Sequence, residues 1–196
     1  MHWSQAPIGV ILAGGLGRRL GGAKASADLC GRPLISYPVQ ALREALGEVV
    51  VVAKADTELP SLGATEVWIE PAARHHPLVG ILHALDRAEG RGVLVCAADM
   101  PFVTPALVRE IAGADPQGAA AVVPVSGGEL QPLLALYLPA ATAALDADAA
   151  AAGAPLRRTV AAIDPLLLEV GDRDRGAFVN VNTREDLRRA AAAIRT

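Results

Sequence analysis

Short apolar runs, separated by stretches with helical patterns, organise this chain. The first run, residues 8–13, is rich in branched side chains and ends at a glycine pair, as a buried strand of a parallel sheet does. Similar runs predict strands at residues 49–53, 67–69, 92–97, 119–124 and 133–137, and the stretches between predict helices at residues 34–46, 78–88 and 105–112. Pro38 argues against an uninterrupted first helix. This alternation predicts a mostly parallel sheet covered by helices on both faces, a three-layer α/β/α sandwich.

Two helix boundaries follow from capping residues. Thr104 precedes a proline and is predicted to cap the helix that follows, while Thr183 and Asp186 form a capping box that begins the last helix. The alanine-rich stretch of residues 140–154 favours a surface helix with no chemistry.

Length, charge and cysteine usage narrow the class of protein. With 196 residues, 52% of them hydrophobic, the chain is expected to form a single domain over residues 1–196 around one full core. Its 18 basic and 21 acidic residues leave a net charge of −3, which argues against nucleic acid or a membrane as partner. Cys30 and Cys96 form no metal or disulfide pattern and are expected to be reduced. The start of the chain resembles neither a signal peptide nor a membrane span, so a cytoplasmic protein is expected.

The loop after the first strand carries candidate phosphate chemistry. Residues 12–24, LAGGLGRRLGGAK, contain five glycines and three cations. Glycines let backbone amides approach phosphate oxygens, and cations neutralise the charge of a leaving pyrophosphate, so the loop is interpreted as a triphosphate site. Its spacing excludes both the Walker and the dinucleotide-binding patterns. The alternative is a plain connection whose arginines face solvent, but a position at the carboxyl end of a parallel strand favours ligand binding.

A candidate metal ligand follows the strand predicted at residues 92–97. Asp99 lies at its carboxyl end, where a carboxylate can hold Mg²⁺ and thereby the phosphate oxygens of a nucleotide. The alternative is that Asp99 satisfies backbone amides in a tight turn.

Further polar residues are candidates for the second substrate. Asn180 and Asn182 alternate along a segment predicted to be extended, so both amides are expected to face one way, toward a ligand or a metal-bound phosphate. Asn182 can instead structure the turn before Thr183. Gln131 opens another predicted strand, and the adjacent His75 and His76 are interpreted as solvated loop residues.

Together these segments resemble a known family. The glycine-rich loop, GRPLI at residues 31–35, PLVGI at 77–81, DMPF at 99–102 and FVNVNT at 178–183 are similar to the molybdenum cofactor guanylyltransferases, within the wider nucleotidyltransferase superfamily. The resemblance spans almost the whole chain in the order of the family. It implies a Rossmann-like sheet of the nucleotidyltransferase type.

The resemblance also implies a reaction: transfer of GMP from GTP to the terminal phosphate of molybdopterin, or of its molybdenum form, with Mg²⁺ as cofactor and pyrophosphate as product. A molybdoenzyme or an insertion chaperone would then receive the product. The residues implied are, as catalytic groups, Arg19, Lys24 and Asp99; for the nucleotide, Leu12, Ala13, Gly14, Gly15, Lys24, Glu70 and Asp99; for the acceptor, Gln131, Asn180 and Asn182; and for the metal, Asp99.

The chain departs from the family pattern near the nucleotide. Residues 52–54 are Val-Ala-Lys where the family has an asparagine, residues 70–71 are Glu-Pro where it has an aspartate, and residues 22–24 omit an aspartate before the lysine. Three alternatives therefore stay open: a cytidylyltransferase acting on the same pterin, a phospholactate guanylyltransferase, and a nucleotide-binding partner protein without catalysis.

Overall fold

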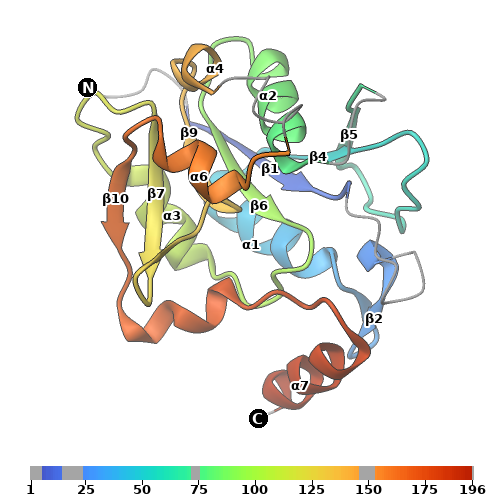
Figure 1. Ribbon diagram of the computed structural model, residues 1–196. Helices are drawn as coiled ribbons and strands as arrows, with labels where there is room; N and C mark the ends of the chain where they lie inside the picture. The colour runs from blue at the N-terminus through green and yellow to red at the C-terminus, as the bar shows by residue number, and fades with distance from the viewer. Residues whose placement is uncertain (1–5, 15–23, 72–75, 146–152, 196) are drawn as a thin grey trace.

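The computed structural model describes residues 6–14, 24–71, 76–145 and 153–195. Its main sheet has the strand order β10-β7-β9-β6-β1-β4-β5, with β8 paired to β7 (Figure 1). The strands are β1 (Ile8–Leu12), β4 (Val49–Ala53), β5 (Glu66–Ile69), β6 (Val93–Ala97), β7 (Ala121–Ser126), β8 (Glu129–Leu130), β9 (Leu134–Tyr137) and β10 (Leu166–Glu169).

The part of the sheet that carries the glycine-rich loop is parallel. β1 pairs in parallel with β4 and β6, and β4 pairs in parallel with β5, so these four strands present their carboxyl ends at one edge. β9 runs antiparallel to β6 and β7. The chain between β7 and β9 is too short for a parallel crossover, which needs a dozen or more residues. The predicted mostly parallel sheet is confirmed, with β9 as its reversed strand.

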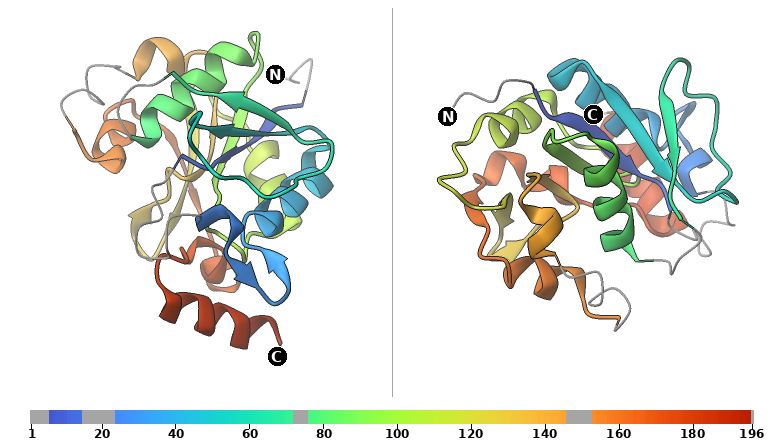
Figure 2. Two further views of the ribbon diagram at one scale, coloured as in Figure 1. Left: turned by 90° about the vertical axis from the view of Figure 1, so that its right-hand side faces the viewer. Right: turned by 90° about the horizontal axis from the view of Figure 1, so that it is seen from above.

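Helices cover both faces of the sheet (Figures 1 and 2). They are α1 (Ser36–Leu46), α2 (Pro77–Arg87), α3 (Pro105–Gly113), α4 (Ala141–Ala144), α6 (Leu156–Ala161) and α7 (Arg184–Ile194), with 3-10 turns η2 (Lys24–Ser26) and η3 (Asp172–Phe178). α1 and α3 bury their apolar sides in one core, and α2, α4 and α6 contribute to a second core across the sheet. The three-layer sandwich is thereby confirmed. No helix in the described ranges has the length and hydropathy needed to cross a bilayer.

The predicted helix boundaries hold where capping residues define them. The Thr104 hydroxyl accepts a hydrogen bond from the Leu107 amide at 3.2 Å and caps α3. The capping box of α7 is also present, with the Asp186 carboxylate accepting from the Thr183 amide at 2.8 Å. Pro38 does not interrupt α1, because it lies in the first turn, where its missing N–H breaks no intrahelical bond.

The helix predicted over residues 140–154 is wrong as a continuous element. α4 ends at Ala144, and Leu145 follows in an extended conformation with its side chain buried against α2 and its neighbours. Residues 146–152 lie outside the described ranges. Alanine favours helix but provides little apolar surface, so the packing of Leu145 decides where the helix ends.

Several elements were not predicted. A hairpin of β2 (Asp28–Leu29) and β3 (Arg32–Pro33) is too short to show a period of two in sequence, and α6, β10 and η3 also escaped prediction. β2, β3 and α7 form what we call the hairpin–helix unit, whose own small core contains Leu29, Leu34, Val181 and Ala190. In Figure 2 (left) α7 lies beside this hairpin at the lower end of the molecule, below the main sheet.

Candidate active site

A cavity of about 360 Å³ lies at the carboxyl ends of the parallel strands. Parallel strands place their carboxyl ends at the same edge, so the loops that follow β1, β4, β5 and β6 meet there. Its wall is lined by Leu12, Ala13, Gly14, Lys24, Ala25, Val52, Glu70, His76, Pro77, Gly80, Ala97, Ala98, Asp99 and Leu133.

The beginning of the glycine-rich loop forms one side of this cavity. The Ala13 amide donates to the Val52 carbonyl at 2.9 Å, and the Leu12 carbonyl accepts from the Ala98 amide at 3.1 Å, so both neighbouring strands hold the loop as it leaves β1. Gly14 follows and lines the cavity. Gly15 and Arg19 lie outside the described residues, so their roles stay predictions.

Lys24, Asp99 and Asn182 converge although they are distant in sequence. The Lys24 ammonium forms an ion pair with Asp99 and donates to Asn182 Oδ1 at 2.6 Å. The Lys24 and Asp99 side chains are only 18% and 14% exposed. Two of the three residues predicted as catalytic therefore meet at the cavity, together with one residue predicted for the acceptor.

Backbone contacts bring the Asn182 segment to Asp99. The Val181 amide donates to the Asp99 carbonyl at 2.9 Å, and the Val181 side chain is buried in the hairpin–helix unit. The Asp186 carboxylate accepts from the Asn182 amide at 3.0 Å. Hydrogen bonds with Thr183 and with the Asn182 amide hold the pKa of Asp186 below its usual value. Asn182 thus serves the helix cap through its backbone and contacts Lys24 through its side chain.

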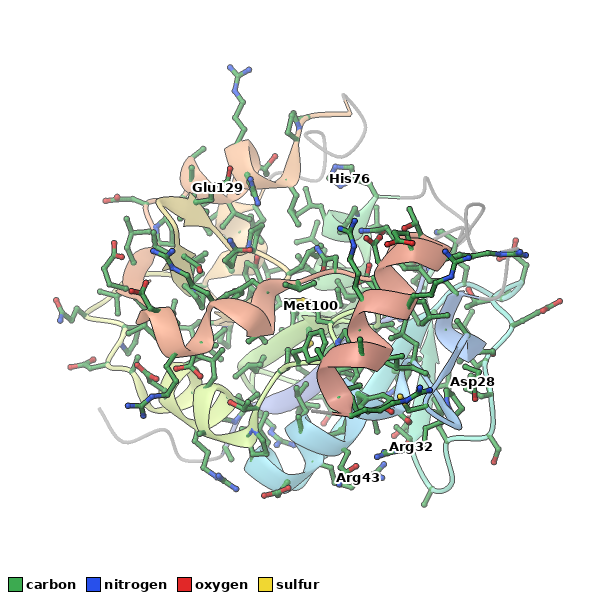
Figure 3. The ribbon with its side chains drawn as sticks, turned by 90° about the horizontal axis from the view of Figure 1, so that it is seen from below. Asp28, Arg32, Arg43, His76, Met100 and Glu129 are labelled. Carbon is green, nitrogen blue, oxygen red and sulfur yellow. The ribbon has the colours of Figure 1, made fainter. Side chains whose placement is uncertain are left out.

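The turn that carries Asp99 is anchored in the interior. Met100 is only 2% exposed, and it lies near the centre of the molecule in the view from below (Figure 3). The Met100 amide donates to the Ala97 carbonyl at 3.3 Å, which closes the turn directly after β6. The alternative interpretation placed Asp99 in a tight turn with its carboxylate bonded to backbone amides. Asp99 does lie in a tight turn, but its carboxylate contacts Lys24.

The side-chain oxygens of Asp99 and Asn182 are suitable ligands for a hard divalent cation. Oxygens of Asp99 and Asn182 both accept from a single ammonium, so both can reach a single positive charge. Mg²⁺ prefers oxygen ligands and is commonly held by one or two carboxylates together with substrate phosphates. No group of three or more His, Cys, Asp or Glu residues that could hold a metal occurs among the residues that the structure describes. The oxygens of Asp99 and Asn182 are thus two ligands that this site offers to a cation.

A buried ion pair lies at the opposite end of the cavity. Lys54 and Glu70 directly follow the paired strands β4 and β5, and their side chains approach to 3.0 Å with only 7% of each exposed. Glu70 lines the cavity, as predicted for a nucleotide-binding residue, although its role stays a prediction. The pair joins two of the three positions at which the chain departs from the family pattern.

His76 was interpreted as a solvated loop residue, and this was wrong. Its Nδ1 accepts from the Leu78 amide at 3.2 Å and caps α2, while its Nε2 donates to the Ala154 carbonyl at 3.0 Å. These two bonds require a neutral ring with its proton on Nε2. The ring is half-buried in the cavity wall. A helix cap directly before Pro77 was the sequence signal that could have found it.

None of the three residues predicted for the acceptor is among the residues that line the cavity, although Asn182 contacts Lys24 of its wall. The Gln131 side chain donates to the Glu129 carbonyl at 3.3 Å, within the turn between β8 and β9. Asn180 is exposed on the segment that leads to Val181. Their roles stay predictions.

Comparison with known proteins agrees with this architecture. Residues 9–166 match the family model of the MobA-like NTP transferase domain. The molybdenum cofactor guanylyltransferase of Cereibacter sphaeroides is 36% identical over 193 residues, which cover 96% of this chain and 97% of that protein. The crystal structure of molybdopterin-guanine dinucleotide biosynthesis protein A from Archaeoglobus fulgidus is similar with a TM-score of 0.74 and 26% identity, covering 95% of this chain and 98% of that one.

A further structure shares the fold at lower identity. The 2-C-methyl-D-erythritol 4-phosphate cytidylyltransferase of Thermus thermophilus superposes with a TM-score of 0.71 and 22% identity, covering 97% of this chain and all of that one. A glycine-rich loop, a lysine and an aspartate at the carboxyl ends of such a sheet define a nucleotidyltransferase. Within that class, the chain belongs to the molybdenum cofactor guanylyltransferase family.

Proposed function

We propose that this enzyme transfers GMP from GTP to the terminal phosphate of molybdopterin, or of its molybdenum form, and releases pyrophosphate. The observation that carries the proposal is the convergence of Asn182 with Lys24 and Asp99, which line the same cavity as Gly14. A cation, a carboxylate and an amide gathered from three distant segments match what phosphoryl transfer needs, which is positioning and neutralisation of charge.

The reaction needs no strong general base. The attacking phosphate of the acceptor is already an anion, and it would displace pyrophosphate in line at the α-phosphorus of GTP. Lys24 and Arg19 would neutralise phosphate charge that grows on the leaving group. Asn182 and Asn180 would orient the acceptor phosphate from the segment that follows η3, and Gln131 would contact the acceptor from the turn before β9.

Asp99, assisted by Asn182, would hold Mg²⁺. A cation held there would supply positive charge next to the phosphates and so reduce their repulsion of the incoming anion. Lys24 contacts both of these side chains, so it has to move toward the phosphates when the cation binds. The oxygen donor set of Asp99 and Asn182 supports this part of the proposal.

The nucleoside would lie at the other end of the cavity. Leu12, Ala13, Gly14 and Gly15 would contact it and the phosphates through their backbone, while the apolar wall around Val52 would cover the base. Glu70 is the carboxylate at this end and would contact the base.

The proposal also covers the surroundings of the reaction. GTP is a cytoplasmic nucleotide, so we place the enzyme in the cytoplasm. Its product would pass to a molybdoenzyme or an insertion chaperone by transient contact.

Pyrophosphate release tests the proposal. The enzyme is incubated with each of the four ribonucleoside triphosphates, Mg²⁺ and molybdopterin, and the same assay is run on Asp99→Ala and on the control Asp172→Ala. Asp172 is a surface acid with 87% of its side chain exposed. Release is expected with GTP, reduced on the order of 10²-fold or more in Asp99→Ala and unchanged in Asp172→Ala.

Other outcomes would replace the proposal. A preference for CTP would indicate a cytidylyltransferase that acts on the same pterin. Turnover with phospholactate in place of molybdopterin would indicate a phospholactate guanylyltransferase. Tight nucleotide binding without pyrophosphate release from any triphosphate would indicate a non-catalytic partner protein.

A further inference from the structure

Lys54 and Glu70 occupy equivalent positions at the edge of the sheet. Each is the first residue after its strand, and the Glu70 amide donates to the Ala53 carbonyl at 2.9 Å, which fixes the two backbones side by side. Glu70 lines the cavity. Lys54 is not among the residues of the cavity wall, and it forms an ion pair with Glu70. In the sheet, β4 and β5 lie two and three strand spacings from β6, which precedes Asp99, or about 10 and 14 Å. The pair therefore belongs to the end of the cavity away from Asp99.

The Glu70 carboxylate has little freedom to move. A Cβ on Gly14 would lie 2.9 Å from Glu70 Oε1, and a Cβ on Gly80 would lie 3.2 Å from Glu70 Oε2, so neither position leaves room for a side chain beside the carboxylate. The Lys54 ammonium forms an ion pair with Glu70 Oε1 at 3.0 Å. A buried carboxylate needs a partner to offset its lost hydration, and Lys54 supplies one. The ion pair with Lys54, in the narrow space beside Gly14 and Gly80, therefore restricts where the Glu70 carboxylate can lie.

We infer that Lys54 is a positioning residue for base selection: it orients the Glu70 carboxylate so that this group contacts the hydrogen-bonding edge of guanine. This inference rests on the proposed use of GTP. Guanine presents N1–H and its 2-amino group as two neighbouring donors, which match the two acceptor oxygens of a carboxylate. Adenine and cytosine present a ring nitrogen acceptor at the corresponding place, which a carboxylate repels. Oε1 has a second lone pair, so it can accept from Lys54 and from the base at once.

Comparing GTP with inosine triphosphate isolates this contact. The two nucleotides differ only in the 2-amino group of the base, so the ratio of their dissociation constants measures one donor. Titration calorimetry gives this ratio for the native chain, for Lys54→Met, for the charge-retaining Lys54→Arg and for the control Arg87→Met. Arg87 forms a surface ion pair with Glu66 of β5, with both side chains at least half exposed.

The native chain is expected to bind GTP about tenfold or more tightly than inosine triphosphate, as for a lost hydrogen bond to a charged group. In Lys54→Met the ratio is expected to fall toward one, chiefly through weaker binding of GTP, while Lys54→Arg and Arg87→Met keep the preference. If Lys54→Met does not fold, Lys54→Gln carries the test: its amide is neutral and one bond shorter than the lysine side chain, so it is expected to hold Glu70 less firmly and the ratio is expected to fall.

Two results would overturn the inference, and they are distinguishable. If the Lys54 variants lose stability and bind both nucleotides more weakly at an unchanged ratio, Lys54 is only structural and the proposed function stands. If the native chain prefers CTP to GTP, the proposed function fails, and guanine reading by Glu70 fails with it.

Discussion

At the scale of single residues, Gly14 and Gly80 are small because Glu70 occupies the space next to them. Neither glycine has a positive φ, so the backbone conformation does not require glycine at these positions. The lack of room for a Cβ does. A Cβ on Gly80 would also lie 3.0 Å from Leu12 Cδ2. Glu70 cannot yield easily, because its carboxylate is buried and paired with Lys54.

Gly14→Ala is therefore expected to destabilise the fold by about 1–3 kcal/mol, as overpacking does, and to weaken GTP binding several-fold by displacing Glu70. Urea unfolding and calorimetric titration measure the two effects. Gly113 offers a matched control, because it ends α3 with open space around its Cβ position. Gly113→Ala should leave GTP binding unchanged and stability equal or slightly higher. Equal behaviour of the two variants would contradict the crowding argument.

At the scale of elements, α2 is associated with two histidines in different surroundings. His76 caps its first turn in the cavity wall, and His83, two turns further on, has a buried Nε2 without a hydrogen-bond partner in the described part of the chain. Burial and the nearby Arg87 guanidinium lower the pKa of His83 below its usual value of 6.5. The fold therefore prefers His83 neutral.

For this reason the free energy of unfolding of the protein is expected to decrease as the pH is lowered. A depressed folded pKa means that the unfolded chain binds more protons, so the stabilisation is complete above pH 6.5 and is lost as the pH falls through the folded pKa of His83. Unfolding midpoints measured between pH 8 and pH 5 should show a smaller decline in His83→Leu than in the native chain. Identical declines would assign the effect to other groups.

At the scale of the whole molecule, the site depends on two packed parts. The main sheet supplies Gly14, Glu70 and Asp99, while Asn182 comes from the segment that leads into α7 of the hairpin–helix unit. Lys24 lies in the turn between the two parts, just before β2. The buried core of the unit, which includes Leu29 at 0% exposure, holds this arrangement together.

Leu29→Ala is expected to destabilise the hairpin–helix unit by about 2–5 kcal/mol, the usual range for truncating a buried leucine. Hydrogen exchange should then become faster in β2, β3 and α7 but not in β1, β4 and β6, and GTP turnover should fall as Asn182 loses its position. Leu107→Ala in α3 is the control, because it removes a buried leucine from the core of the main sheet. Uniformly faster exchange in Leu29→Ala would show that the unit has no separate stability.

The sequence alone determined the features that depend on local pattern. Branched apolar runs marked the main strands, because a strand buried on both faces needs such residues throughout, and Thr104 and Thr183 marked helix starts through their side-chain oxygens. The predictions of phosphate binding at Gly14 and Lys24, and of a metal-binding carboxylate at Asp99, followed from residue types at the ends of strands. The contact of Asn182 with Lys24, 158 positions away, was not predicted from the sequence and was found only in the structure.

Tertiary structure alone decided what depends on packing between distant segments. Alanines at residues 140–154 favoured a longer helix, but burial of Leu145 ends it early. β2 and β3 are two residues each, so no period could reveal them. The pairing of Lys54 with Glu70 arises from the register of β4 and β5, which brings together two positions that looked unrelated in sequence. Contacts of this kind are set by which strands become neighbours, and local sequence carries little information about that choice.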